Sequence, residues 1–474
     1  MTTRAAAVLL ALVTALAAAG CKRAERPPNV ILITLDTTRP DHLGVYGYGG
    51  ATSPNLDRFA EGATVYRRAY ATSSWTLPTH ASMFTGLYPM QHGAQSVPQG
   101  PNKSLGYGVR PLQDSFVTLA ELLKDAGYRT GAVIAGPALR AELGVAQGFE
   151  NYDDEFTSAG EKFTGRRAEK VTDIAIEMID SFGDAPYFLF VNFFDAHAPY
   201  RPPAPYSDVL GPPPTKEQAQ AGIDTLKGFV AKLDDGAEPV AVDRLAPAYR
   251  ESMDAQLAGY DAEIRYMDHH LGRLLDTLLA GREGERTLVV ITADHGESFG
   301  EHYFFSHGAS LYEDNVRVPL IVRYPGQSRS REVETAAQNH RVFATILREA
   351  GVAAPDGPAS VTLEDAPPTI VLQVKRSESN VKIFGEFFER DLISIVEWPR
   401  KLIESSRGKT ELFSLDKDPQ ELVNLTTVDA DAAAQLSKSL ADFAGAHPPL
   451  FDADDRAELR KDTVEALKAM GYLD

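Results

Sequence analysis

The 474-residue sequence contains a single cysteine, Cys21, so no disulfide can form within the chain. It has no internal repeat and no low-complexity tract. Basic residues are in deficit, since 47 Lys and Arg stand against 66 Asp and Glu, and no local basic patch offsets the net charge of −19. A nucleic-acid partner is therefore not expected. With 43% hydrophobic residues, the chain can bury a large core, as one domain or as a large domain with a small one.

Long apolar runs are absent except at the start, where residues 5–19 follow Arg4 and lead to Cys21. This segment is typical of an export signal rather than of a membrane span. A cysteine after small residues resembles a bacterial lipoprotein processing site, which implies a signal peptide over residues 1–21 with Cys21 as the lipidation site. A plain secretory signal is the alternative. We expect the protein in the bacterial cell envelope, periplasmic or at the surface, with membrane contact only through the N-terminal lipid.

The rest of the chain alternates short apolar runs with segments of helical periodicity. The runs lie at residues 30–35, 131–134, 187–194, 287–292 and 318–323. Each suits a strand that is buried on both faces. The longest helical pattern runs from Leu257 to Leu278. This order predicts an α/β fold with a mostly parallel sheet sandwiched by helices.

Two regions depart from this rhythm. The proline-rich residues 200–246 are expected to form an inserted loop over one rim of the sheet. Beyond residue 360, closely spaced runs predict a small antiparallel sheet, followed by a polar tail and a final helix near 462–470. These runs lie at 369–373, 381–387 and 392–398. We therefore expect a main domain over residues 29–360 and a C-terminal α+β subdomain over residues 361–474.

Acidic residues follow three of the predicted strands. Asp36 comes directly after one run, Asp294 and His295 after another, and Asp195 and His197 after a third. Because the carboxyl ends of parallel strands meet at one edge of a sheet, these side chains should converge. Carboxylates packed together are unfavourable unless a cation neutralises them. A bound divalent metal is therefore the simplest explanation for acidic side chains that converge at one edge. Capping of the following helix by each Asp is the alternative.

The segment from Ser73 to Gly86 resembles the signature of the sulfatase family. In that family a cysteine or serine, converted to formylglycine, is followed at fixed spacing by proline, a small hydroxyl residue, arginine and a final Thr-Gly. Four positions match: Pro78, Thr79, Thr85 and Gly86. Two depart, since Thr76 stands in the nucleophile's place and His80 in the arginine's. Further likeness is spread along the chain, at residues 29–39, 53–62, 294–302, 312–319 and 411–425.

The resemblance implies a metal-dependent ester hydrolase or transferase in which Asp36, Asp294 and His295 hold one divalent metal and Thr76 completes its shell. Thr37 takes the place of a second family acid. The remaining set resembles that of the phosphonate monoester hydrolases and phosphoglycerol transferases of the alkaline-phosphatase superfamily. Mixed carboxylate and imidazole ligands suit manganese or zinc better than an all-oxygen calcium cage. Magnesium is the fourth candidate, and manganese is favoured.

Thr76 changes the chemistry that the family name implies. An aliphatic hydroxyl becomes a nucleophile when a metal stabilises its alkoxide. The second hydroxyl of formylglycine lets a sulfated intermediate collapse, whereas an intermediate on threonine must be opened by displacement at phosphorus or sulfur. This favours phosphate or phosphonate esters of a small molecule, glycan or lipid. A true sulfatase without formylglycine and a catalytically inactive binding lipoprotein are the alternatives.

Other candidate residues surround this set. His80, His197 and His307 are predicted donors to the substrate oxygens or the leaving group, because imidazole donates a hydrogen bond or a proton near neutral pH. His302 and Arg39 are predicted substrate contacts, although Arg39 could instead anchor its own loop. Two further acids are possible metal ligands: Asp195 and Asp261.

Overall fold

The computed structural model describes residues 26–97, 108–155, 165–208, 217, 224, 247–365, 368–377, 380–382, 385–452 and 459–469. The expected signal segment, residues 1–21, lies outside them, as does most of the expected insertion at 200–246. Among the helices of the described residues, none is both long enough and apolar enough to cross a bilayer.

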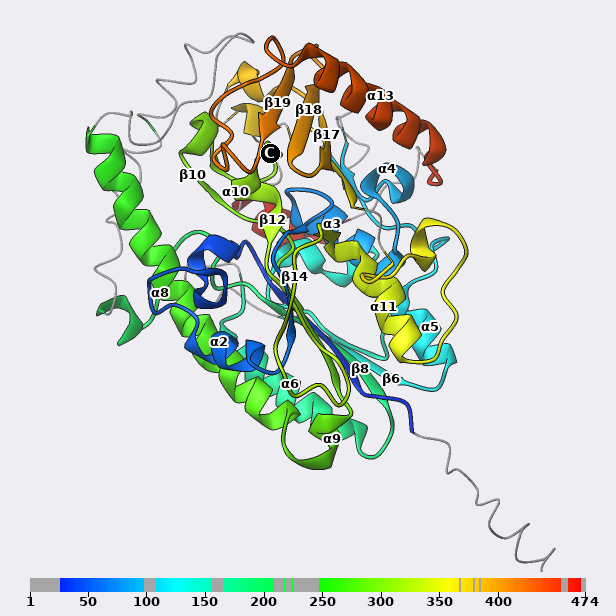
Figure 1. Ribbon diagram of the computed structural model, residues 1–474. Coiled ribbons are helices and arrows are strands. Elements are labelled where there is room, and N and C mark those ends of the chain that lie inside the picture. The colour runs from blue at the N-terminus through cyan, green and yellow to red at the C-terminus, as the bar shows by residue number, and fades with distance from the viewer. Residues whose placement is uncertain are drawn as a thin grey trace, which may run out of the picture.

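An eight-stranded sheet forms the centre of the molecule (Figure 1). In spatial order its strands are β14 (Arg331–Val333), β2 (Thr64–Tyr66), β13 (Leu320–Arg323), β9 (Leu288–Thr292), β1 (Val30–Leu35), β8 (Tyr187–Phe193), β6 (Arg129–Val133) and β7 (Asn151–Asp153). The five strands from β9 to β7 are parallel, which confirms the predicted sheet. β13 is antiparallel to β9, because the connection between them contains no long crossover helix.

Helices cover both faces of this sheet (Figure 1). One face packs against α2 (Pro54–Ala60), α6 (Ala168–Phe182) and α8 (Pro247–Leu278), and the other against α3 (Thr76–Thr85), α5 (Leu119–Asp125) and α11 (Val342–Glu349). β1 shows why: Ile31 and Ile33 belong to the first core cluster, and Val30 and Leu32 to the second. Successive strand side chains point to opposite faces, so a strand buried on both sides must be apolar throughout.

A smaller antiparallel sheet forms the C-terminal subdomain. Its strands, in order, are β16 (Thr369–Val374), β17 (Leu392–Glu397), β18 (Arg400–Ser405) and β19 (Thr410–Ser414). α13 (Ala430–Ala446) covers its outer face through Leu436 and Leu440. The inner face packs on Tyr70 and Leu311 of the main domain. The subdomain is therefore joined to the main domain by an apolar interface.

The strand predicted at 381–387 is wrong. Asn380 to Lys382 is helical, and a 3-10 helix follows at Glu386–Phe388. Gly385, with φ of 102°, breaks any extended run here, and the ring of Phe388 packs on Phe304 instead of joining the sheet. β18, β19 and α13 were not predicted, because the expected polar tail began before them.

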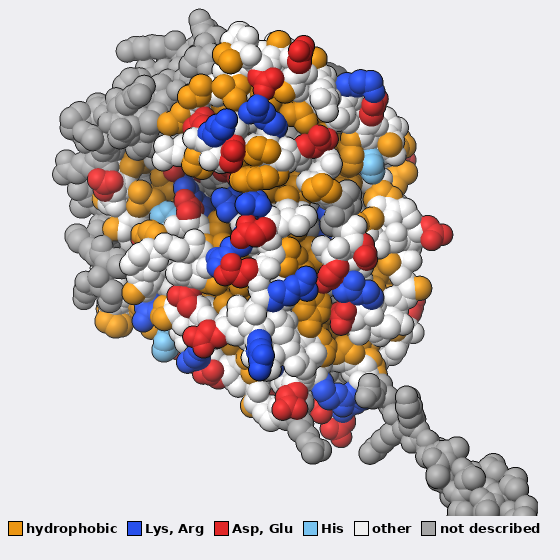
Figure 2. All heavy atoms as spheres, viewed as in Figure 1, with side chains coloured by type: hydrophobic (Ala, Val, Ile, Leu, Met, Phe, Trp, Pro, Cys, Tyr) orange, Lys and Arg blue, Asp and Glu red, His pale blue; other side chains and the backbone are white. Residues whose placement is uncertain are grey.

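The remaining elements are short. The helices are α4 (Pro89–His92), α9 (Gly281–Glu285), α10 (Glu313–Val316) and α14 (Lys461–Ala469). The strands are β3 (Ala69–Tyr70), β4 (Gln95–Ser96), β5 (Val109–Arg110), β10 (Ser298–Phe299), β11 (Phe305–Ser306), β12 (Arg317–Val318) and β15 (Ala337–Gln338). The face drawn in Figure 2 carries acidic and basic side chains interspersed with one another.

Candidate active site

Asp36 is fixed at the carboxyl end of β1. Its backbone N–H donates to the Phe193 carbonyl at 3.0 Å, which extends the pairing with β8 by one residue. Thr37 then turns the chain with φ of 55°. The hydroxyl of Tyr260, on α8, donates to the Thr37 carbonyl at 2.8 Å and accepts from the Arg39 N–H at 2.8 Å. A core helix therefore holds the loop that carries Asp36.

Asp294 and His295 follow β9, the other neighbour of β1. Oδ1 of Asp294 accepts from the backbone N–H of His295 at 2.9 Å and of Thr37 at 3.3 Å. Nδ1 of His295 donates to the Gly296 carbonyl at 2.9 Å, and Nε2 lies 3.4 Å from Oδ2 of Asp294. A Cβ on Gly296 would come within 2.0 Å of the Asp314 carbonyl oxygen, so only glycine fits this turn.

These loops bring together the three residues predicted to hold a metal. One ligand atom from each of Asp36, Asp294 and His295 lies within 4.8 Å of the others, and all three side chains are buried. Neither carboxylate oxygen of Asp36 has a hydrogen-bond partner among the described residues, and neither does Oδ2 of Asp294. Buried carboxylate oxygens without donors are costly unless a cation binds them. The group therefore fits a divalent metal.

The two carboxyl groups of this site have pKa values that are shifted in opposite directions. Burial, followed by the carboxylates of Asp294 and Glu297, raises the pKa of Asp36 well above its usual range. Burial also acts to raise the pKa of Asp294, but the imidazoles of His295 and His80 outweigh it, and the pKa is lowered. Without a cation, Asp36 is the carboxyl group that disfavours ionisation.

Thr76 lies beside the three-residue group. It is the first residue of α3, its side chain is buried, and its Oγ1 lies 3.2 Å from Nε2 of His295. The preceding residue, Trp75, is extended, with φ of −144°. The change from extended to helical backbone therefore places the Thr76 hydroxyl at the start of the helix, next to the metal-ligand candidates.

His80 lies one turn further along α3 and is completely buried. Its Nδ1 donates to the Thr76 carbonyl at 2.8 Å, and its Nε2 lies 3.1 Å from Oγ1 of Thr34 on β1. Burial lowers the pKa of this imidazole. Nδ1 thus bonds within α3 and Nε2 joins α3 to β1, which differs from the expected contact with substrate and makes His80 a support for Thr76.

His197 and His307 do lie next to the group. The ring centroid of His307 is 4.3 Å from that of His295 and 4.9 Å from that of His197. Nδ1 of His197 donates to the Ala198 carbonyl at 2.7 Å. Burial lowers the pKa of His197 to about 3 and that of His307 to about 4. Three imidazoles therefore extend in series from the metal-ligand candidates.

Glu297 belongs to the site although the sequence did not mark it as a site residue. Its Oε1 accepts from Nδ1 of His307 at 3.0 Å and its Oε2 from the Tyr200 hydroxyl at 3.3 Å. Burial raises the pKa of this carboxyl group to about 7. The available signal was its place two residues after His295, but sequence spacing alone does not give the direction of a side chain in a loop.

Arg39 anchors its own loop. Its Nε and Nη2 donate to the carboxylate of Asp41 at 3.0 and 2.7 Å, and its Nη1 donates to Glu301 at 2.9 Å and to the Glu297 carbonyl at 3.0 Å. The guanidinium is therefore engaged by protein oxygens on each nitrogen, which favours the anchoring alternative over the substrate contact.

His302 faces the C-terminal subdomain instead of the metal-ligand candidates. Its ring stacks on Tyr312, with centroids 3.6 Å apart. Burial lowers its pKa to about 3, and the next largest contribution comes from Lys401 of β18. The structure therefore does not bring His302 to the predicted substrate position.

The two other acids also lie elsewhere. Oδ1 of Asp195 accepts from the Ala168 N–H at 3.2 Å, at the first residue of α6. Asp261 pairs with Nδ1 of His42 at 2.6 Å. Neither belongs to the three-residue group. The helix that Asp195 contacts precedes it in the chain, so this contact is not the expected capping of a following helix.

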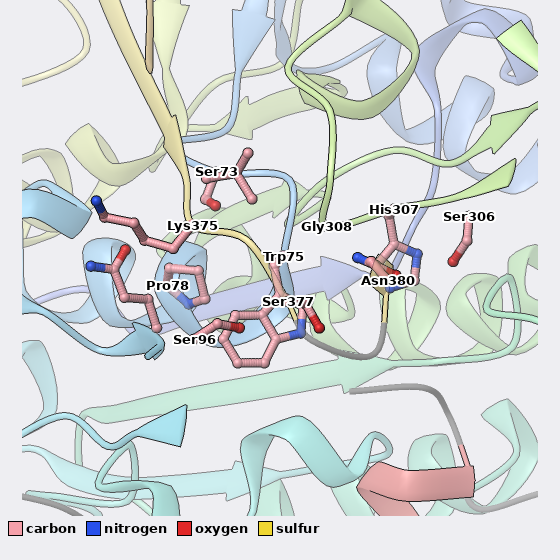
Figure 3. Close-up of a pocket in the computed structure, with 12 residues that line it drawn as sticks. Ser73, Trp75, Pro78, Ser96, Ser306, His307, Gly308, Lys375, Ser377 and Asn380 are labelled. Atoms are coloured by element: carbon pink, nitrogen blue, oxygen red, sulfur yellow. The ribbon is translucent and has the colours of Figure 1, made fainter. Parts of the chain in front are cut away.

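Trp75 and Pro78, which lie on either side of Thr76 in the sequence, line a pocket (Figure 3). Trp75, Ser96 and His307 line it from the main domain, and Lys375 and Asn380 line it from the C-terminal subdomain. The Lys375 ammonium pairs with a carboxylate, that of Asp391, at 2.7 Å. The subdomain thus supplies one wall of this pocket.

Comparison with known proteins agrees with this geometry. Residues 28–352 match the sulfatase family, and residues 300–444 match the C-terminal region of N-sulphoglucosamine sulphohydrolase. The chain is 24% identical to the uncharacterized sulfatase YidJ of Escherichia coli (strain K12), over 88% of this chain and 87% of that protein. It is 25% identical to an arylsulfatase of Clostridium perfringens, over 84% of this chain and 90% of that protein.

Among solved structures, the phosphonate monoester hydrolase of Agrobacterium radiobacter has the same fold, with a TM-score of 0.67 at 22% identity. The superposition covers 89% of this chain and 96% of that protein. Since the family match extends over more than half of the sequence and includes the loops that carry Asp36, Thr76 and Asp294, the chain is an ester hydrolase of the sulfatase family.

Proposed function

We propose that the protein is a metal-dependent hydrolase or transferase of phosphate or phosphonate esters, with Thr76 as its nucleophile. The observation that carries the proposal is the 3.2 Å separation between Oγ1 of Thr76 and Nε2 of His295, next to buried carboxylate oxygens of Asp36 and Asp294 without donors. A nucleophilic hydroxyl and a cation site are thus adjacent, as alkoxide formation requires.

A divalent cation held by Asp36, Asp294 and His295 would polarise the ester and stabilise the alkoxide of Thr76. We propose manganese first, ahead of zinc, magnesium and calcium, because the set combines two carboxylates with one imidazole. The chain's own contribution is orientation: His80 holds the first turn of α3 against β1, and so fixes the backbone of Thr76.

His197 and His307 are proposed as the groups that contact the substrate oxygens or the leaving group. Both are buried, and the ring of His307 lies between those of His295 and His197. Imidazole nitrogens in this position would hydrogen-bond to the oxygens of a bound ester.

The single hydroxyl of Thr76 favours phosphorus over sulfur as the reacting centre. An ester formed on Thr76 has no second hydroxyl to expel it, so it must be opened by displacement, a route that suits phosphoryl groups. Sulfate-ester hydrolysis without formylglycine is the second candidate, favoured by the family match and by the arylsulfatase among the relatives.

We further propose that the protein acts as a lipoprotein in the bacterial cell envelope, anchored through Cys21. The apolar residues 5–19 before this only cysteine support that location. The proposed substrates are small-molecule, glycan or lipid esters, and no nucleic acid is proposed as a partner.

The test is turnover of phosphate monoesters, phosphate diesters, phosphonates and sulfate esters with Mn²⁺, Zn²⁺, Ca²⁺ or Mg²⁺. Thr76→Ala should lower kcat at least about 10³-fold, because the nucleophile is lost. Thr85→Ala, at the other end of the same helix, is the matched control and should keep most of the activity.

Three outcomes would change the proposal. Sulfate esters as the best substrates would overturn the preference for phosphorus. Full activity of Thr76→Ala would overturn the nucleophile. A protein that binds none of the four metals and turns over no ester would instead be a binding lipoprotein.

A further inference from the structure

We propose that Glu297 is a positioning residue of this site, which fixes the ring of His307 so that Nε2 of His307 is presented to the ester. The inference rests on the proposed function, because it assigns a supporting residue to His307, one of the two imidazoles proposed to contact the substrate oxygens or the leaving group. It concerns the orientation of His307, and not the binding of the metal.

The contact between the two side chains is direct and buried. Oε1 of Glu297 lies 3.0 Å from Nδ1 of His307, and the two residues are 1% and 4% exposed. A carboxylate oxygen accepts, so the imidazole donates from Nδ1, which selects one face and one tautomer of the ring. With Nδ1 engaged by Glu297, a contact of this ring with a substrate has to be made through Nε2.

Glu297 is itself held by two other loops. The hydroxyl of Tyr200, in the loop after β8, donates to Oε2 at 3.3 Å. Nη1 of Arg39, in the loop after β1, donates to the Glu297 backbone carbonyl at 3.0 Å. Loops from three neighbouring strands thus meet at Glu297, one at its carboxylate and one at its backbone carbonyl. Supports of this kind keep a functional side chain in one geometry before the substrate arrives.

His307 lies near the candidate nucleophile and also lines the pocket. Its ring centroid is 4.3 Å from that of His295, whose Nε2 lies 3.2 Å from Oγ1 of Thr76. On the other side, His307 lines the pocket together with Trp75 and Asn380 (Figure 3). An ester attacked by Thr76 with its alcohol portion in this pocket would place the bridging oxygen near His307.

The test compares two esters of the same acid in the metal-loaded protein, one with p-nitrophenol and one with a simple alkyl alcohol. Glu297→Gln should lower kcat for the alkyl ester about 10- to 100-fold, as loss of a supporting carboxylate does. The p-nitrophenyl ester should lose less than about 3-fold, because its leaving oxygen needs little help from an imidazole. KM and the bound metal should stay unchanged.

Two matched variants sharpen the result. Glu301→Gln removes a carboxylate that accepts from Arg39 and has no contact with His307 among the described residues. It should leave the turnover of both esters unaffected. The double variant Glu297→Gln/His307→Ala should cost no more than His307→Ala alone, because Glu297 acts through that ring. Equal losses on both esters, or additive losses in the double variant, would overturn the proposal.

A spectroscopic measurement separates this proposal from the proposed function. The ¹⁵N signals of the His307 ring, assigned with His307→Gln, should show a proton on Nδ1 in the wild type and should shift in Glu297→Ala. If no ester is turned over, the proposed function fails, while this measurement still tests the positioning. Unchanged His307 signals in Glu297→Ala would overturn it.

Discussion

Two pairs of acidic side chains in this protein differ in whether a protein cation lies between them. Asp36 and Asp294, at the ends of β1 and β9, include oxygens without a hydrogen-bond partner among the described residues. Glu313 and Glu421, at the junction with the C-terminal subdomain, flank Lys401, whose Nζ lies 2.9 Å from an oxygen of each. The side chain of Lys401 is 0% exposed, so this second cluster contains its own cation.

The difference shows which observation indicates a metal site. Each cluster contains at least one buried acid, so burial by itself does not distinguish them. At the first pair the nearby imidazoles of His80 and His295 have pKa values lowered by burial, so they favour the neutral form and do not supply a full positive charge. The absence of a protein cation beside buried carboxylate oxygens is therefore what calls for a metal.

The largest expected effect on stability comes from removing the protein's own cation. Lys401→Met leaves the buried Glu421 and the partly buried Glu313 without their cation and should lower the free energy of unfolding by about 3–5 kcal/mol, with metal binding retained. Urea denaturation at constant pH measures the change. Lys438→Met is the control, since its ion pair with Asp442 is exposed and should be worth less than about 1 kcal/mol. Equal costs for the two variants would break the comparison.

At the other pair, Asp36 and Asp294, we expect a substitution to raise the free energy of unfolding of the metal-free protein. Burial raises the pKa of Asp36, so the metal-free protein loses stability as the pH rises above the unfolded value of 3.8 toward the folded one. Asp36→Asn removes that loss and should stabilise the metal-free protein by about 1–3 kcal/mol at neutral pH.

The same variant should lose the stabilisation that Mn²⁺ gives the wild type, because a ligand that binds the folded state raises its stability by mass action. Thermal denaturation with and without Mn²⁺ measures both effects. A metal-free Asp36→Asn protein that is less stable than the wild type would contradict the interpretation.

The smallest effect concerns a buried imidazole that is neutral and has no ionic partner among the described residues. His92 accepts at Nδ1 from the Ala94 N–H at 3.1 Å, and its Nε2 lies 3.0 Å from the Ser82 hydroxyl. Burial lowers its pKa from 6.5 to about 3. The unfolded chain therefore takes up this proton first, and stability that is complete above pH 6.5 is lost as the pH falls.

The expected slope from this one group is at most about 1.4 kcal/mol per pH unit. His92→Gln should reduce the difference in unfolding free energy between pH 6.5 and pH 5.0, as measured by urea denaturation. His269→Gln, at an exposed position, should leave that difference unchanged. Equal slopes for the wild type and His92→Gln would mean that the buried histidine does not control this response.

The parts of the protein that were predictable depend on local patterns. The apolar runs ending at Asp36 and Asp294 identified both strands, because a strand covered on both faces has to be apolar throughout. β18 and β19 escaped the same reasoning, since each carries a buried charged residue, Lys401 and Glu411. Lys401 pairs with Glu313, and Glu411 accepts from the Tyr312 hydroxyl, both contacts between distant parts of the chain that a pattern of hydrophobicity does not reveal.

The sequence by itself determined the family, the central sheet and three side chains at one sheet edge, because the apolar run that forms each strand and the residue that follows it are local properties. Only the tertiary structure decided which other polar groups join them. Arg39 is engaged by Asp41 and Glu301, His302 stacks on Tyr312, and Glu297 turns toward His307. The physical reason is that loop side chains take their direction from partners elsewhere in the fold, such as Tyr200 for Glu297, and spacing along the chain does not encode those contacts.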